Sequence, residues 1–170
     1  MAVSPFDSGL YRGLFHDAEM GRLFTDSAEV RAMLLVEGAL ARVQGALGLI
    51  PEVSAQAIHR ASLELQVDPA GLAAETGRNG VPVPALVRAT RQLMQAPEHA
   101  QYLHWGATSQ DIVDTALVLR LRQAVSILDA RLAAVAAQLA ELAEAHAALP
   151  MAARTWGQVA TPTTFGAVAA

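Results

Sequence analysis

Residues 118–149 decide the fold, and they read VLRLRQAVSILDARLAAVAAQLAELAEAHAAL. Their apolar residues recur at alternating spacings of three and four, and no glycine or proline interrupts residues 111–149. This pattern predicts one α-helix of roughly 35–40 residues, about 55 Å long. We call the positions that set the pattern the seam: Val118, Leu121, Val125, Leu128, Leu132, Val135, Leu139, Leu142, His146 and Leu149.

The residues beside the seam are small rather than charged. A two-stranded coiled coil would carry charged side chains in these positions, whereas alanines let neighbouring helices approach from several sides. The sequence therefore favours a buried helix in a multi-helix bundle over an exposed dimer zipper. The alanines concerned are Ala133, Ala134, Ala136, Ala137, Ala140 and Ala143.

Shorter helices are expected before residue 108. A capping box at Asp26–Glu29 opens a helix that Gly48 should end. A later short helix should close at Gly77, and another follows at about residues 84–96. The prediction is an all-α fold, in which a small N-terminal helical domain precedes the long first helix of a central helical bundle.

Composition excludes several classes of function. The 170 residues include 16 acidic and 12 basic ones, and the net charge of −4 gives no sign of a nucleic-acid partner. Without cysteine there are no disulfides, thiolate nucleophiles or thiolate metal sites. All 12 basic residues are arginine, so no lysine can form a Schiff base. Residues 1–7 carry no leader-like pattern and no long uncharged apolar run follows, so we expect a cytoplasmic protein without a membrane span.

A first candidate site lies at residues 104–114, which read HWGATSQDIVD. Thr108 is a predicted helix N-cap, with Asp111 three residues further on. The unpaired backbone N–H groups of a helix start, together with the hydroxyls of Thr108 and Ser109, could bind a carboxylate or a phosphate. The alternative is an ordinary, well-capped helix start.

A second candidate site begins at Arg154, where residues 154–158 read RTWGQ. Arginine matches carboxylates through two parallel hydrogen bonds, and threonine, tryptophan and glutamine side chains accompany it. A polar connection between helices is the alternative interpretation. His146, at a seam position, is more typical of a packed core or interface histidine than of a catalyst. No histidine pair has metal-motif spacing, and no phosphate-binding or GxSxG motif is present.

These two stretches resemble the signature regions of a known enzyme family. Residues 102–116 resemble the first signature of the fumarase/aspartase superfamily, and residues 154–166 resemble the second. Val36-Glu37 and Leu47–Pro51 are similar to the family's first long helix and its end. The resemblance covers essentially the whole chain, and implies a helical domain at residues 1–107 and the start of a central bundle domain at residues 108–170.

Departures from the adenylosuccinate lyases, one branch of the family, narrow the choice of reaction within it. Trp156 stands where adenylosuccinate lyases carry a histidine, residues 77–81 lack a second histidine, and Leu14-Phe15 replace an Arg-Tyr pair that serves a phosphate. The chain thus looks like the 3-carboxy-cis,cis-muconate cycloisomerases of protocatechuate breakdown. An adenylosuccinate lyase-like or other fumarate-releasing lyase is the alternative.

The resemblance implies that a muconate carboxylate adds to a conjugated double bond, giving a lactone through an aci-carboxylate intermediate. It assigns stabilisation of the developing charge to Thr108 and Ser109, with no metal and no cofactor. Binding of the polycarboxylate substrate falls to His104, Arg154, Thr155, Trp156 and Gln158.

The family's third signature, a glycine- and serine-rich loop followed by a lysine, has no counterpart here. That loop supplies the proton-transferring serine, and family members are homotetramers whose active sites combine several subunits. Thr161 is predicted to cap a helix that the sequence enters but does not finish at Ala170, so we expect a fragment that is inactive alone. A non-catalytic helical oligomerisation fragment is a further alternative.

Overall fold

The computed structural model describes residues 4–6 and 8–170, and the chain divides into two compact units, Met1–Ala124 and Val125–Ala170. Helices dominate, and the strands of the described residues are only two residues long. The predicted all-α class is confirmed. Residues 1–3 and 7, part of the stretch in which we saw no leader, lie outside the described residues. The domain boundary between 107 and 108 stays a prediction.

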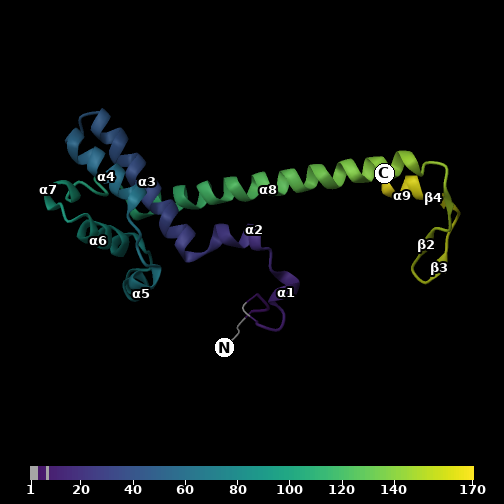
Figure 1. Cartoon of the computed structure of the whole chain (residues 1–170). Helices are drawn as coiled ribbons and strands as arrows, with labels where there is room; N and C mark the ends of the chain where they lie inside the picture. Colours follow the sequence, from purple (N-terminus) through teal and green to yellow (C-terminus); the bar gives the residue numbers. More distant parts are fainter. Residues whose placement is uncertain (1–3, 7) are drawn as a thin grey trace. The chain divides into compact units, whose positions relative to one another are not determined.

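The first unit is a set of helices joined by short loops (Figure 1). Its last helix, α8, continues into the second unit. The elements in chain order are α1 (Arg12–Phe15), α2 (Ala18–Gly21), η1 (Arg22–Phe24), α3 (Asp26–Ala46), α4 (Glu52–Glu64), η2 (Pro69–Leu72), α5 (Ala73–Asn79), α6 (Val83–Met94), α7 (Pro97–Ala100) and α8 (Ser109–Ala145).

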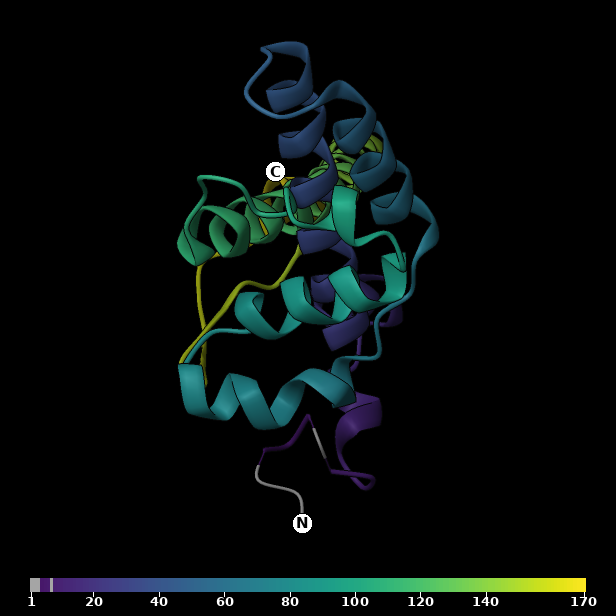
Figure 2. The ribbon, with the colours of Figure 1, turned by 90° about the vertical axis from the view of Figure 1, so that its left-hand side faces the viewer.

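Helices α3 and α4 form a hairpin whose close packing depends on two glycines. The helices run side by side in both views (Figures 1 and 2). A Cβ atom at Gly38 would lie 2.7 Å from the Cβ atom of Ser62, and one at Gly45 would lie 2.4 Å from that of Ala55. Both distances are far below carbon–carbon contact, so only glycine fits at these two positions.

The hydrophobic core of the first unit joins helices from distant parts of the chain. Burying each large apolar side chain stabilises the fold by about 1.5–3 kcal/mol. The core residues come from α3, α4, α6 and the start of α8, and each is no more than 2% exposed: Met33, Leu34, Ile58, Leu86 and Ile112.

Helix α8 confirms the long helix that the seam predicts, with 37 residues from Ser109 to Ala145. Its buried residues, Ile112, Ala116, Arg120 and Ala124, recur every fourth position and belong to a different face from the seam. The seam itself is not buried among the described residues, and Leu132 is 67% exposed. In this chain α8 therefore packs through one stripe, which includes the buried Arg120, and leaves the apolar seam open to solvent.

Several predicted helix boundaries were wrong by a few residues. Thr25, not Asp26, caps α3, and its Oγ1 accepts a hydrogen bond of 3.2 Å from the N–H of Ala28. Gly77 lies inside α5, which ends instead at Asn79, because the next residue, Gly80, has the left-handed backbone (φ 74°) that stops a helix.

The second unit ends in two small two-stranded antiparallel sheets and a short helix. Strand β1 (Pro150–Met151) pairs with β4 (Thr163–Thr164), and β2 (Arg154–Thr155) pairs with β3 (Gln158–Val159). Helix α9 (Phe165–Ala169) begins after Thr164 rather than at the predicted cap Thr161, because the Oγ1 atom of Thr164 accepts from the N–H of Ala167.

The residues after α8 bend back onto its end. The backbone N–H of Gly166 donates to the carbonyl of His146 over 2.9 Å, and that of Phe165 donates to Leu149 over 2.9 Å. The ring of His146 lies against that of Phe165, with 5.1 Å between centroids. These contacts agree with the packing role predicted for His146, and they end α8 at Ala145 rather than at the predicted Leu149.

Candidate substrate-binding site

The loop before α8 carries the first candidate residue, His104, and three helix side chains hold it. From α6, a guanidinium nitrogen of Arg91 donates to the carbonyl of Leu103 over 2.8 Å. From α3, Glu37 Oε1 lies 2.7 Å from His104 Nδ1, and Gln44 Nε2 donates to the carbonyl of Trp105 over 2.7 Å. Each of residues 103, 104 and 105 thus contacts one of these three side chains. We call Glu37, Gln44 and Arg91 the loop clamp.

The pair of Glu37 and His104 combines burial with an uncommon backbone conformation. The side chain of Glu37 is 1% exposed and that of His104 is 19% exposed. His104 has a φ of 63°, a left-handed conformation that few non-glycine residues adopt. Burial raises the pKa of the Glu37 carboxyl, while the nearby His104 and, more weakly, Arg91 oppose this rise.

Thr108 and Ser109 stand at the N-terminus of α8, as predicted. The backbone N–H of Thr108 donates to Asp111 Oδ2 over 3.0 Å, which is one half of the predicted Thr-x-x-Asp capping box. Gly106, with φ 67°, turns the chain just before them. The first N–H groups of a helix have no partner within it, so this end is suited to an anionic group.

The remaining candidates lie on the hairpin of β2 and β3 in the second unit. Register pairs Thr155 with Gln158 and Arg154 with Val159. Because directly paired residues share a face and neighbours alternate, Thr155 and Gln158 lie on one face and Arg154 on the other. Trp156 and Gly157 form the turn, and the Trp156 side chain is fully exposed.

The structure therefore presents two groups of candidate residues, one in each unit. His104, Thr108 and Ser109 belong to one short segment of the first unit. The four candidates of residues 154–158 belong to the second. In the described part of the chain no three histidine, aspartate or glutamate side chains gather closely enough to hold a metal ion. No described helix is both long and apolar enough to cross a membrane.

The loop clamp was not predicted as part of the site, although Glu37 gave a signal. Glu37 follows the buried Met33 and Leu34 at helical spacing and precedes the buried Ala41, so it occupies a core position of α3. A carboxylate at such a position is rarely buried without a partner, and this could have marked it. Nothing local in the sequence indicates that the partner is His104, 67 residues away.

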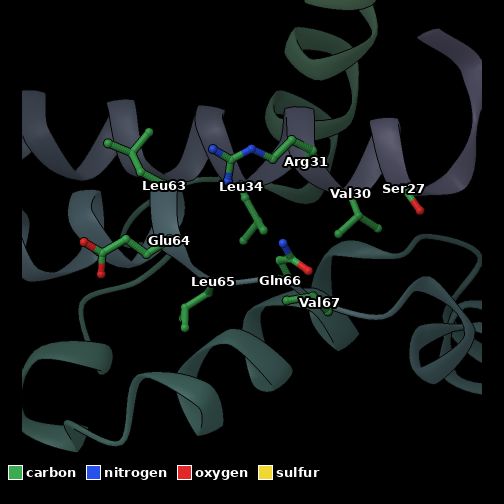
Figure 3. Close-up of a pocket in the computed structure, with 9 residues that line it drawn as sticks. All are labelled: Ser27, Val30, Arg31, Leu34, Leu63, Glu64, Leu65, Gln66 and Val67. Carbon is green, nitrogen blue, oxygen red and sulfur yellow. The ribbon is translucent and has the colours of Figure 1, made fainter. Parts of the chain in front are cut away.

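A cavity elsewhere in the first unit contains none of the candidate residues. It has a volume of about 440 Å³ and lies between α3 and residues 63–67. Figure 3 shows Leu34 of α3 pointing toward the segment that carries Leu65, Gln66 and Val67. The guanidinium of Arg31 is already used, because it donates to the carbonyl of Ser62 over 2.6 Å.

Comparison with known proteins identifies the family. A family model described as "Lyase" matches residues 15–170, so the chain belongs to this lyase family of the fumarase/aspartase superfamily. The resemblance predicted from the two signature stretches is confirmed.

Individual relatives differ in the reactions that their names describe. A 3-carboxy-cis,cis-muconate cycloisomerase of Pseudomonas putida is 40% identical over 162 residues, covering 92% of this chain and 38% of the relative. A nitrosuccinate lyase of Streptomyces davaonensis is also 40% identical, covering 96% and 35%. The crystal structure of the β-carboxy-cis,cis-muconate cycloisomerase of Acinetobacter calcoaceticus superposes with a TM-score of 0.89 at 34% identity, covering 94% and 38%. The chain thus spans little more than a third of the length of these relatives.

Proposed function

We propose that this chain is part of a cytoplasmic, cofactor-independent cycloisomerase that converts 3-carboxy-cis,cis-muconate to a carboxymuconolactone. The observation that carries the proposal is the likeness to muconate cycloisomerases in sequence and fold, together with Trp156 after Arg154-Thr155. An indole cannot shuttle a proton as the histidine of adenylosuccinate lyases would. This departure supports an intramolecular addition over cleavage of a nucleotide.

The proposed reaction needs hydrogen-bond donors more than a nucleophile. One carboxylate oxygen of the substrate bonds to a carbon of the conjugated double bond, and the displaced electron pair moves onto another carboxyl group as an aci-carboxylate. A proton then adds to the adjacent carbon, so the product is an isomer of the substrate. Preorganised donors stabilise the charge that builds up on that carboxyl group.

We assign these donors to residues of both groups. Thr108, Ser109 and the N-terminus of α8 stabilise the aci-carboxylate, and His104, just before them, binds the substrate. Arg154 binds a second carboxylate of the substrate through two parallel hydrogen bonds. Thr155 and Gln158, which share a hairpin face, donate further hydrogen bonds, and Trp156 offers an apolar surface to the carbon skeleton.

Assay of the full-length protein with 3-carboxymuconate tests the proposal. Lactone formation consumes one of the two conjugated double bonds, so the ultraviolet absorbance should fall. Arg154→Gln should raise KM more than Arg154→Lys. Lysine keeps the positive charge and loses only the planar guanidinium that makes two parallel hydrogen bonds. No lactone, with fumarate released from adenylosuccinate instead, would overturn the proposal.

A fumarate-releasing or related lyase is the second candidate. The nitrosuccinate lyase relative favours it, because it is as similar to this chain as the Pseudomonas putida cycloisomerase is. Consumption of nitrosuccinate without consumption of 3-carboxymuconate would support this candidate.

We further propose a homotetramer, with domains at residues 1–107 and 108–170 in each subunit. The open seam supports it, because Leu128, Leu132 and Leu139 are 48%, 67% and 43% exposed and a helix bundle would cover them. Sedimentation equilibrium of the full-length protein should give a tetramer, and a monomer or dimer at micromolar concentration would contradict this.

A non-catalytic oligomerisation fragment is the third candidate, supported by the same open seam. Residues 1–170 alone should show little or no turnover, and easily measured turnover would exclude a purely structural fragment.

A further inference from the structure

We propose that Glu37 is a positioning residue that decides which ring nitrogen of His104 faces a ligand. The Glu37 carboxylate keeps a proton on Nδ1 of His104, and Nε2 is left to meet the substrate. The catalytic consequence rests on the proposed substrate-binding role of His104, whereas the arrangement of the ring does not.

The proposal takes Glu37 as ionised, and this charge gives the hydrogen bond its direction. Glu37 Oε1 and His104 Nδ1 are 2.7 Å apart, the short distance of a charge-assisted bond. An ionised carboxylate can only accept, so Nδ1 is the donor. The partner of one ring nitrogen sets the protonation of both and the ring orientation. The carboxylate lies on the buried side, with only 1% of the Glu37 side chain exposed against 19% for His104.

The backbone around His104 adds a second constraint. Its left-handed conformation, at φ 63°, is one that persists only where the surroundings enforce it. The clamp residues Arg91 and Gln44 enforce it by binding the carbonyl groups of Leu103 and Trp105. With the backbone held on both sides and Nδ1 held on Glu37, the ring has one accessible orientation.

Stability alone gives no reason for a glutamate at position 37. Burying a carboxylate is unfavourable unless hydrogen bonds satisfy both of its oxygens. Within residues 4–6 and 8–170, Glu37 Oε2 is buried and has no hydrogen-bond partner. An apolar side chain would suit a core position of α3 better, so the carboxylate is explained by its action on His104.

Nitrogen NMR of the 170-residue chain tests the ring arrangement without any substrate. Long-range ¹H–¹⁵N spectra report which nitrogen of a neutral imidazole carries the proton, and the His104 signal is assigned by its loss in His104→Gln. We expect neutral His104 to carry its proton on Nδ1. A proton on Nε2 in the unsubstituted chain would overturn the proposal.

Variants then separate the action of Glu37 from general loosening of the loop. Glu37→Leu should move the proton toward Nε2, whereas Glu37→Gln should keep it on Nδ1 because the amide oxygen can still accept. Gln44→Leu is the matched control, because it removes a neighbouring bond of the clamp and should leave the Nδ1 proton in place. An unchanged tautomer in folded Glu37→Leu, or a change in Gln44→Leu, would refute the specific role of Glu37.

Kinetics of the full-length protein test the consequence for the substrate. Glu37→Leu should raise KM about two- to tenfold, the size of one hydrogen bond, with Glu37→Gln close to the unsubstituted enzyme. Adding Glu37→Leu to His104→Gln should cause no further rise, because Glu37 acts only through His104. An additive rise would refute the positioning role. If muconate is not turned over while Nδ1 carries the proton, the proposed function fails and the arrangement of the pair stands.

Discussion

Replacing Gly45 with alanine should force α3 and α4 apart. The new Cβ atom would lie 2.4 Å from the Cβ atom of Ala55, whereas non-bonded carbon atoms pack at about 3.5–4.0 Å. Both atoms are fixed directly to backbone, so no rotation of a side chain can relieve the clash. The two helices must therefore separate by about 1 Å or more at this point.

The size of the effect follows from two opposing contributions. Overpacking a core typically destabilises a protein by about 1–3 kcal/mol, and Gly→Ala inside a helix stabilises it by about 0.8–1.0 kcal/mol. We therefore expect Gly45→Ala to lower the free energy of unfolding by up to about 2 kcal/mol. Gly77→Ala in α5 is the matched control, because nothing lies within 4 Å of its new Cβ atom, and it should stabilise by about 1 kcal/mol.

Urea unfolding followed by far-ultraviolet circular dichroism measures both variants, at one protein concentration because association also shifts stability. Adding Ala55→Gly to Gly45→Ala removes the clashing atom, so the double-mutant cycle should show a coupling of about 1–3 kcal/mol. Equal stability of Gly45→Ala and Gly77→Ala, or independent effects at positions 45 and 55, would refute the close-packing argument.

Three further changes probe the pH dependence, the end of the chain and the exposed hairpin. Burial raises the pKa of Glu37 above its ordinary 4.5, so the folded state holds this proton more tightly than the unfolded state. The unsubstituted chain should therefore lose stability relative to Glu37→Gln as the pH rises from about 4.5 through the raised pKa; a pH-independent difference in urea midpoints would contradict this. Gly166→Ala places a Cβ atom 2.5 Å from the carbonyl oxygen of Ala143, so it should detach α9 and speed amide exchange at residues 165–169, and unchanged exchange would count against this packing. Trp156→Ala should change the thermal stability of the 170-residue chain by less than about 0.5 kcal/mol because the side chain is fully exposed, and a larger loss would mean that Trp156 is covered in solution.

The parts of the fold that sequence could predict are those with local causes. The seam and the lack of glycine or proline make α8 a helix whatever surrounds it, and Thr108 with Asp111 marks its start. The end of α8 depends instead on backbone groups of Phe165 and Gly166 that return from further along the chain. No local pattern near Leu149 announces that contact, so the predicted helix was four residues too long.

The candidate site divides in the same way. The hydroxyl and charged side chains of the two signature stretches can be read from the sequence. Their neighbours and the faces on which they lie come from the structure. The pairing of Thr155 with Gln158 on one hairpin face depends on the register that a turn at Trp156-Gly157 produces. The link between Glu37 and His104 depends on the packing of α3 against the loop before α8, which composition and periodicity do not specify.

The left-handed backbone at His104 limits what evolution or a mutant library can try there. Glycine, asparagine and aspartate accept a positive φ readily, histidine does so more often than most residues, and β-branched side chains scarcely do so. Most substitutions at residue 104 would thus destabilise the loop backbone, whatever the chemistry of the new side chain. Among the tolerated residues, aspartate would place a second acid beside the buried carboxylate of Glu37, glycine would leave that carboxylate without a partner, and asparagine alone keeps a hydrogen-bond donor. Residue 104 must therefore both accept a positive φ and provide a partner for the Glu37 carboxylate. A new activity in this loop would more easily arise at neighbouring residues than at residue 104 itself.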